Sequence, residues 1–511
     1  MAIDVPFVLF LSGVLLCGCS SLGVYSLVSS LNVDEGLGTW SLALAYGTSL
    51  LIANLTPVIG CYFGCKKLLT IAEISWLLFI LGNMYTSYYT VLPAGFFLGC
   101  GEAFGWTALP IITTYFGKRR ASADPANVEK HVRYYTGYYF GVLQGSIVVG
   151  NAINFAILHI DRSLADANTS HNTTKRNIDY SVCGANDCQI GNITGANMEQ
   201  YTPAFPITRY ALIAVYAVLM ICCIILHSIV LPNDINWNLT VPKSSANQEI
   251  GTAPLEIDLV DRDSKGTAAE TNNRKIVEEK SLIKDSSEKE ETVSLKNVFM
   301  TTIKATIKIA FNPKHLLVVL LAIYNGMTIG FVVGELTRAY ASCILSVGKV
   351  GVCIMLFSTA DCVFSLIAGK MAGKLGRNLP YFIAFVIDIG LYVFSIHWEF
   401  NAGNEWLVYI IFLMFGCSDG IWQTLVTAMY GEYFVEEQQL ALNLWNVVLN
   451  FGFLIQYAMS TAFCVYTKLY IQITVLCVAV GTYAISQFIY YPPETCRDSE
   501  VTNDHDEIPK L

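Results

Sequence analysis

Four carboxylic acids lie in the middle of long apolar stretches of this 511-residue chain: Glu102, Asp361, Asp388 and Asp419. A charged side chain at the centre of a bilayer costs roughly 2.5–3.5 kcal/mol on insertion scales, so such acids usually face the inside of a helix bundle and mark function. They could line a cavity that responds to protons or cations. Alternatively, each acid is protonated or held by hydrogen bonds from a neighbouring helix.

Two trios of amide side chains accompany these acids. Within each trio the spacing is three, four or seven residues, which places its members on one face of a helix. The trios are Gln144, Asn151 and Asn154, and Asn443, Asn446 and Asn450. Each trio makes a polar stripe on an apolar helix, and we group both with the acids as candidates for intramembrane function.

Two of the acids belong to a pattern that occurs twice in the chain. Gly99-Cys-Gly-Glu102 resembles Gly416-Cys-Ser-Asp419, and a Trp and a Thr follow each. Glycines four apart, followed by cations, also recur at 60–67 and 369–377. Because folds built from two similar halves place a cavity between them, we expect Glu102 and Asp419 to approach each other across it.

The chain lacks the usual signals of an enzyme. Gly416-Cys-Ser-Asp-Gly420 matches the nucleophile motif G-x-S-x-G, but that motif requires a turn from strand to helix, and here it lies in an apolar helix. There is no phosphate-binding loop and no pair of His four apart. We therefore expect no catalytic residue, no metal and no cofactor. Much of the charge lies in one loop and one tail, so no nucleic-acid surface is implied.

Twelve apolar stretches are long enough to hold these residues in a lipid bilayer. The chain is 54 % hydrophobic and only 14 % charged, whereas soluble proteins carry about 25 % charged residues. A membrane-spanning helix needs about 20 apolar residues. The predicted spans are 5–31, 40–62, 68–89, 91–116, 134–159, 207–231, 315–340, 348–372, 379–398, 406–430, 441–465 and 468–491. The predicted fold is an all-α membrane protein of twelve transmembrane helices in two six-helix halves, of the major facilitator kind.

The segments between the spans define the domains and their orientation. The N-terminal half, 1–231, contains a polar outer loop at 160–206; a charged linker at 232–313 precedes the C-terminal half, 314–491, and an acidic tail at 492–511. Lys and Arg collect in the segments that are cytosolic when the N-terminus is inside. We therefore expect the linker, the tail and both termini in the cytosol.

Glycosylation sequons agree with this orientation. Asn168, Asn172 and Asn192 each begin an Asn-x-Ser/Thr sequon in the outer loop, while Asn238 begins one on the cytosolic side. Because sequons are modified only outside the cytosol, we expect glycans in the outer loop and none on Asn238.

Two pairs of residues near the outer face are expected to bond. Cys183 and Cys188 lie in the outer loop, where the compartment is oxidising. We predict a short-range disulfide between them, with two free thiols as the alternative. Glu335 and Arg338 lie three apart near an outer helix end and are expected to form a structural ion pair.

The cytosolic linker contains one candidate sorting signal. Glu278 is followed, after three residues, by Leu282-Ile283, which has the form of an acidic dileucine motif for a sorting adaptor. The surrounding segment is polar, with the composition of a disordered region. The alternative is a plain solvated charged linker.

The segment Ser29–Thr39, SSLNVDEGLGT, resembles the signature that follows the first span in the uncoordinated-93 family, a branch related to the major facilitator superfamily. The resemblance extends over nearly all spans. The other segments that carry it are Trp106-Thr-Ala, Gln144 with Gly150-Asn151, the Cys183 to Cys188 element, and Gly416-Cys-Ser-Asp-Gly-Ile-Trp-Gln-Thr424.

This resemblance implies a function exerted through other membrane proteins. Members of the family regulate a two-pore-domain potassium channel complex or escort Toll-like receptors from the endoplasmic reticulum. The expected function is non-enzymatic regulation or trafficking of an integral membrane partner, a potassium channel or a receptor. The expected location is the plasma membrane, with endosomal or endoplasmic reticulum membranes as alternatives. The alternative function is a proton- or cation-coupled transporter of a small solute, using Glu102, Asp361 and Asp419.

Overall fold

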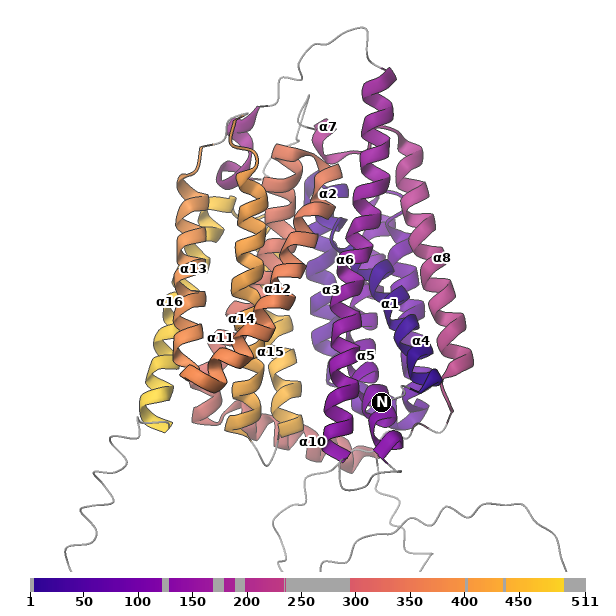
Figure 1. The fold of residues 1–511 in the computed structure, drawn as a ribbon, viewed down its shortest axis with the longest axis vertical. Helices are drawn as coiled ribbons and strands as arrows, with labels where there is room; N and C mark the ends of the chain where they lie inside the picture. The colour runs from indigo at the N-terminus through magenta and orange to yellow at the C-terminus, as the bar shows by residue number, and fades with distance from the viewer. Residues whose placement is uncertain are drawn as a thin grey trace, which may run out of the picture. The chain divides into compact units, whose positions relative to one another are not determined.

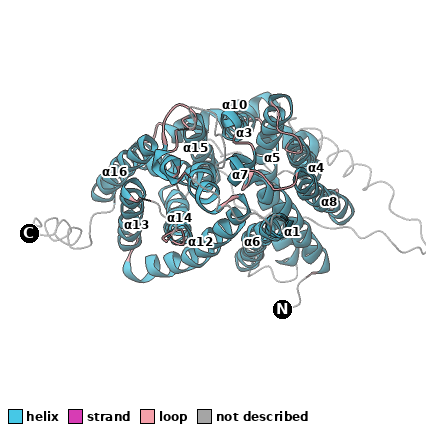
Figure 2. Cartoon of the chain, turned by 90° about the horizontal axis from the view of Figure 1, so that it is seen from above, coloured by secondary structure: helices cyan, strands magenta, loops and turns pink. Residues whose placement is uncertain are grey.

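The structure is a computed structural model that describes residues 4–121, 128–168, 179–188, 198–233, 235, 295–399, 403–434 and 438–490. These residues form helices and short connections, and they contain no strand (Figure 2). The elements before the linker are α1 (Val5–Tyr25), α2 (Val28–Leu31), η1 (Asp34–Gly36), α3 (Leu37–Ala53), α4 (Thr56–Gly82), α5 (Tyr88–Ala121), α6 (Val128–Asn168), η3 (Tyr180–Val182), η4 (Gly184–Asn186), α7 (Met198–Tyr201) and α8 (Pro206–Val230). Those after it are α10 (Leu295–Ala310), α11 (Pro313–Phe331), η6 (Val332–Leu345), α12 (Val347–Leu375), α13 (Asn378–His397), α14 (Leu407–Tyr433), α15 (Gln438–Ala458) and α16 (Val465–Tyr490).

Contacts within the chain separate two units. One unit is Met1–Leu239 with Ala305–Leu511, and the other is Thr240–Lys304, of which the structure describes 295–304, the first part of α10. Within the first unit, α1, α4, α5, α6 and α8 lie on one side, and α13, α14 and α16 lie on the other (Figures 1 and 2). The helices α3 and α15 pack against each other, as do α6 and α12, and these contacts join the two sides.

Eleven of the described helical segments are long and apolar enough to cross a membrane. They match eleven of the twelve predicted spans, and the remaining one, 68–89, corresponds to α4. That helix carries Lys66, Lys67 and Glu73 and is not among the eleven. The second and third spans also have different limits from those predicted. The helix α3 ends at Ala53, and Thr56-Pro57 begins α4, because proline suits the first turn of a helix.

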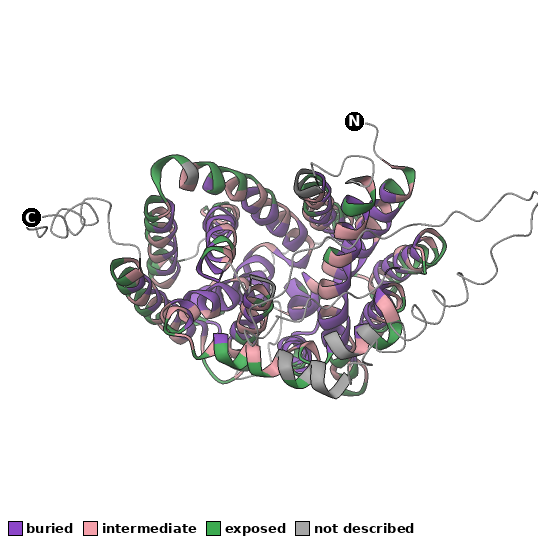
Figure 3. Cartoon of the chain, turned by 90° about the horizontal axis from the view of Figure 1, so that it is seen from below, coloured by how far each residue is buried: buried purple, intermediate pink, exposed green. Residues whose placement is uncertain are grey.

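Large apolar side chains cover the outside of the bundle. Leu51, Leu366, Phe382 and Phe488 are each more than 60 % exposed. The exposed sides of the helices face outward and the buried sides face one another (Figure 3). A soluble protein would not leave so much apolar surface in water, so this surface is suited to lipid.

A glycine with positive φ lies close to each of the two glycine–cation segments of the predicted repeat, but not at corresponding positions, because the repeat aligns Gly64 with Gly373. Gly64 lies within α4 with φ 78° and ψ 161°, and Gly376 follows α12 with φ 78° and ψ 159°. A Cβ atom added to either glycine would meet nothing within 4 Å. Glycine is therefore needed there for its positive φ, which other residues adopt only with strain.

The Gly-Cys pattern marks two corresponding helix contacts. A Cβ on Gly99 would lie 2.2 Å from the backbone oxygen of Ala45, and a Cβ on Gly416 would lie 2.2 Å from that of Phe357. These glycines let α5 pack closely on α3 and α14 on α12, as small residues do between membrane helices. Each contact places the acid three residues later, Glu102 or Asp419, at a fixed position in the bundle.

Candidate functional site

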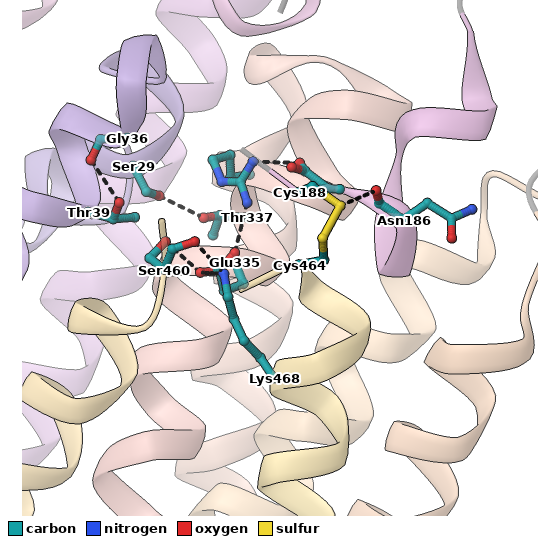
Figure 4. Close-up of polar contacts among 12 residues, drawn as sticks. Ser29, Gly36, Thr39, Asn186, Cys188, Glu335, Thr337, Ser460, Cys464 and Lys468 are labelled. Carbon is teal, nitrogen blue, oxygen red and sulfur yellow. Dashed lines mark hydrogen bonds and ion pairs between the residues drawn. A yellow bond between two sulfur atoms is a disulfide. The ribbon is translucent and has the colours of Figure 1, made fainter. Parts of the chain in front are cut away.

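A buried ionic cluster joins η6 to the start of α16 (Figure 4). The Glu335 carboxylate accepts hydrogen bonds from Lys468 Nζ at 2.6 Å and from Arg338 Nη2 at 2.8 Å. Ser460 Oγ also donates to Glu335 at 2.6 Å, and Arg338 Nη1 donates to Asp187. We call Asp187, Glu335, Arg338 and Lys468 the ionic cluster. Two cations balance two anions, which is what burial of charge requires.

The predicted pair of Glu335 and Arg338 is confirmed, but it is one part of this larger cluster. Lys468 and Asp187 come from segments far away in sequence, and nothing in their local spacing indicated the contact. The π-helical winding of η6 holds Glu335, Thr337 and Arg338 together. Ser29 donates to the Val333 carbonyl and bonds the Thr337 hydroxyl at 3.1 Å, so α2 also contacts η6.

The predicted disulfide between Cys183 and Cys188 is wrong. Cys183 pairs with Cys343 of η6. Cys188 pairs with Cys464, the residue before α16 (Figure 4). The two cysteines lie on either side of η4, and each meets a partner in a different C-terminal segment. Sequence proximity suggested a hairpin, whereas the bonds link distant parts of the chain.

Polar contacts hold the same segment, 179–188, against the C-terminal helices. The backbone N–H of Val465 donates to the Asp187 carbonyl at 2.9 Å. The Tyr180 hydroxyl donates to Glu405 at 2.6 Å; burial, reinforced by that carboxylate, raises the pKa of Tyr180 to about 12. Tyr180 therefore remains a hydrogen-bond donor at any physiological pH.

Two of the candidate acids are held by neighbouring side chains of the C-terminal helices. Asp388 accepts from the Tyr324 hydroxyl at 2.6 Å and from Trp422 Nε1 at 2.7 Å. Asp419 accepts from Asn325 Nδ2 at 3.0 Å and Gln423 Nε2 at 2.9 Å. Both acids are buried. These bonds tie α11, α13 and α14 together.

Asp361 on α12 connects helices from the two sides of the bundle. It accepts a hydrogen bond from Gln144 Nε2 of α6 at 2.8 Å, and Ser365 Oγ lies 3.4 Å from its other oxygen. A Cβ on Gly420, the residue after Asp419, would lie 2.4 Å from the Asp361 backbone oxygen. The structure thus brings Gln144 to Asp361 and packs the segment that carries Asp419 against the same part of α12.

Glu102 does not meet Asp419, contrary to expectation. It accepts from Trp76 Nε1 at 3.2 Å and from Trp106 Nε1. Glu102 and both indoles line a small cavity that also involves α1 and α6. Among the described contacts, none joins Glu102 to Asp419. The close packing of α5 on α3 and of α14 on α12 turns each acid toward its own neighbours.

The two amide trios have different environments. Asn151 donates to Ser26 Oγ at 3.2 Å, and Asn154 donates to the Gly23 carbonyl at 2.8 Å, so both are buried between α6 and α1. On α15, Asn443 and Asn446 are exposed, and Asn450 donates to Ser49 Oγ of α3 at 3.3 Å. The α6 amides therefore contribute to helix packing, while the α15 stripe is open on one face.

Sequence patterns gave no sign of a chain of tyrosine hydroxyls across the bundle. Tyr25 bonds Tyr46 at 2.9 Å and Tyr457 at 2.8 Å. Tyr46 also stacks on Phe453 with ring centroids 4.3 Å apart. These three tyrosines link α1 and α3 to α15. A single tyrosine in an apolar helix does not predict which other helices its hydroxyl will contact.

One group of side chains has the atoms of a metal site. The carboxylate of Glu73, the thiol of Cys223 and the imidazole of His227 converge, and all three residues are buried. Cys223 and His227 are four apart on α8, a helical ligand spacing that a search for two His does not reveal.

Asp419→Leu is expected to destabilise the protein, and Asp419→Asn much less. Leucine leaves the amides of Asn325 and Gln423 without their acceptor, which costs roughly 1–3 kcal/mol per buried group. Asparagine keeps the size and one acceptor, so it should fold and reach its membrane. Thermal unfolding in detergent, with surface biotinylation, measures both effects. A leucine variant as stable as wild type would show that these hydrogen bonds contribute little.

Several curated proteins resemble the chain over most of its length. No family model matches it. Protein unc-93 homolog A of Xenopus laevis is 29 % identical over 473 residues, covering 91 % of this chain and 89 % of that protein. The Homo sapiens protein of the same name is 27 % identical with the same coverage. The chain is thus similar over 91 % of its length to proteins named unc-93 homolog A. A worm relative from Caenorhabditis elegans, "Putative potassium channel regulatory protein unc-93", is 24 % identical over 80 % of this chain and 50 % of that protein.

Solved structures of transporters share the fold of this chain. A nucleoside transporter, NupG, superposes with a TM-score of 0.57 at 9 % identity, covering 94 % of this chain and 99 % of that one. The E. coli xylose transporter XylE, in a partially occluded inward-open conformation, gives 0.52 at 14 % identity, covering 95 % and 97 %. The fold therefore resembles that of these transporters, which agrees with the predicted all-α membrane fold of the major facilitator kind. At these identities the likeness concerns the fold alone.

Some predicted sites lie beyond the part of the chain that the structure describes. Asn172, Asn192, Glu278, Leu282 and Ile283 are outside the described residues. Asn168 is the last residue of α6.

Proposed function

We propose that this protein is a non-enzymatic regulator or trafficking partner of another integral membrane protein, with a potassium channel as the first candidate. The similarity to unc-93 homologues across 91 % of the chain carries this proposal. The buried acids support it, since Asp388 and Asp419 each accept two hydrogen bonds from neighbouring side chains. Acids held in this way suit a scaffold with a defined conformation.

The test is affinity purification of the full-length chain in mild detergent from cells that express candidate two-pore-domain potassium channels or receptors. A multi-pass protein of unrelated fold, tagged in the same way, is the control. One channel should co-purify selectively, and its current should change with co-expression at a matched surface level. No selective partner and no change in any current would overturn the proposal.

The fold favours a second candidate, a proton- or cation-coupled transporter. The specific observation is the hydrogen bond between Gln144 and Asp361, which joins helices from the two sides of a transporter-like bundle. Uptake of small solutes into proteoliposomes under a pH gradient distinguishes the candidates. Uptake lost in Asp361→Asn, with no partner bound, would favour transport.

We further propose a twelve-span topology of two six-helix halves, with α4 as the twelfth span and both termini in the cytosol. The corresponding close contacts of Gly99 with α3 and of Gly416 with α12 support two similar halves. Glycans are expected on Asn168, Asn172 or Asn192 and none on Asn238. Each Asn is replaced by Gln in turn, and the mass shift on glycosidase treatment is measured. A shift that depends only on Asn238 would invert the topology.

The linker is proposed to carry a sorting signal at Glu278, Leu282 and Ile283, which a sorting adaptor would bind. Replacing Leu282 and Ile283 by Ala removes the apolar pair and should increase the fraction at the plasma membrane. Surface biotinylation of both forms measures that fraction, with Leu255→Ala in the same linker as a control. If the two forms have equal fractions at the plasma membrane, the linker carries no sorting signal at these residues. The membrane in which the protein resides would then be determined by other segments.

A further inference from the structure

A second buried polar group lies away from the acids described above, between α1, α4 and α8. Glu73 of α4 lies against Cys223 and His227 of α8, and none of the three is more than 1 % exposed. Cys223 Sγ is 3.4 Å from Glu73 Oε1 and 3.6 Å from His227 Nδ1. The Glu73 oxygen also contacts His227 Nδ1 directly, and its other oxygen has no hydrogen-bond partner among the described residues.

The imidazole of His227 is oriented as in metal-binding histidines. Its Nε2 lies 3.0 Å from the Phe10 carbonyl oxygen, which can only accept, so Nε2 carries the proton. In the neutral ring the lone pair is then on Nδ1, which faces Glu73 and Cys223. Histidines that bind metals almost always donate their other N–H to a carbonyl or carboxylate in this way.

A glycine on α1 makes room for this arrangement. A Cβ on Gly13 would lie 2.1 Å from His227 Nε2. Because Gly13 has no side chain, the imidazole of His227 can approach α1 and reach the Phe10 carbonyl of that helix. The ring is therefore fixed by two helices before any ligand arrives.

The distances suit a tetrahedral ion. Bonds of about 2.3 Å to sulfur and about 2.0–2.2 Å to nitrogen or oxygen place neighbouring ligands roughly 3.3–3.7 Å apart. The two distances from Cys223 Sγ fall in this range. The contact between Glu73 and His227 is shorter than two ligands of one ion allow. To bind an ion, either these two side chains must move apart or the unpartnered oxygen of Glu73 must turn toward the ion. These three side chains leave the fourth position of the ion to a water molecule.

We propose that Glu73, Cys223 and His227 form a buried site for a divalent transition metal ion, Zn²⁺ by ligand type. Thiolate, imidazole and carboxylate are the ligands that zinc takes in proteins, whereas magnesium and calcium take oxygen alone. An ion there would join α4 and α8, and the Phe10 carbonyl of α1 would orient one of its ligands. His227 lies in the last turn of α8, so the site is close to a helix end from which an ion could enter.

The test uses the full-length chain, purified in detergent with a tag free of histidine, and ZnCl₂ as the probe. The protein is chelated, loaded, desalted and analysed by elemental mass spectrometry. Wild type should retain one zinc per chain. Cys223→Ser should lose it, with affinity reduced at least about tenfold, and Cys222→Ser should keep it, because Cys222 is the adjacent residue and exposed.

Two further measurements keep the result decisive. Co²⁺ should give a thiolate-to-metal absorption band in wild type and Cys222→Ser that is absent in Cys223→Ser. If Cys223→Ser does not fold by its melting profile, His227→Gln replaces it. A wild type that retains no zinc, or a Cys223→Ser protein that retains as much as Cys222→Ser, would overturn the proposal and leave a plain hydrogen-bonded group.

Discussion

Glu335→Gln is expected to be among the most destabilising single substitutions in the described part of the chain. Both carboxylate oxygens of Glu335 are in use, one by Lys468 and Ser460 and the other by Arg338. Without this charge, two buried cations share only Asp187. Breaking a buried ion pair by removing one partner costs roughly 3–5 kcal/mol. Thermal unfolding in detergent and the fraction that leaves the endoplasmic reticulum should both fall.

Two comparisons show whether burial of charge causes the loss. Glu432→Gln removes the partner of Arg377 in an ion pair whose carboxylate is 57 % exposed, and it should cost less than about 1 kcal/mol. Combining Glu335→Gln with Lys468→Met removes an anion and a cation together and should restore part of the stability. If Glu335→Gln unfolds like Glu432→Gln, the ionic cluster does not hold the helices together.

Non-reducing peptide mapping is expected to recover Cys183 joined to Cys343 and Cys188 joined to Cys464. The bonds span 160 and 276 residues. In the chain-entropy account, closing a loop of this size stabilises the folded state by on the order of 5 kcal/mol. Cys343→Ser or Cys464→Ser should therefore lower thermal stability strongly and leave Cys183 or Cys188 reactive.

Cys477→Ser is the control for this experiment, because Cys477 is an exposed free cysteine on α16. It should leave both the peptide map and the stability unchanged. Recovery of a peptide in which Cys183 is bonded to Cys188 would contradict the structure and support the short-range disulfide that the sequence predicted.

The sequence predicted features that depend on local spacing. Apolar stretches gave eleven of the spans, and an i, i+3 spacing gave the pair of Glu335 and Arg338. The acids were expected inside the bundle, and Asp361, Asp388 and Asp419 are buried there. These results follow because the rise and turn of a helix are fixed, so spacing along the chain converts directly into position on one helix.

Contacts between distant helices were not predictable in this way. Lys468 is 133 residues from Glu335, and the partners of Cys183 and Cys188 lie beyond the predicted linker at 232–313. Glu102 and Asp419 occupy similar places in the repeat, yet the structure turns them to different neighbours. The packing of the whole bundle decides which helices contact each other and at which residues. The spacing of residues in a single sequence does not indicate these contacts.

The bond between Cys188 and Cys464 also places a condition on synthesis. A ribosome adds 276 residues between the two cysteines, which takes roughly 15–55 s at 5–20 residues per second. During this time Cys188 has emerged but its partner does not exist, and Cys183, five residues away, is the nearest thiol. Correct pairing therefore requires Cys188 to stay unpaired, or its bond to be reopened, until Cys464 is made. The finished bond is then a chemical record that translation passed Cys464.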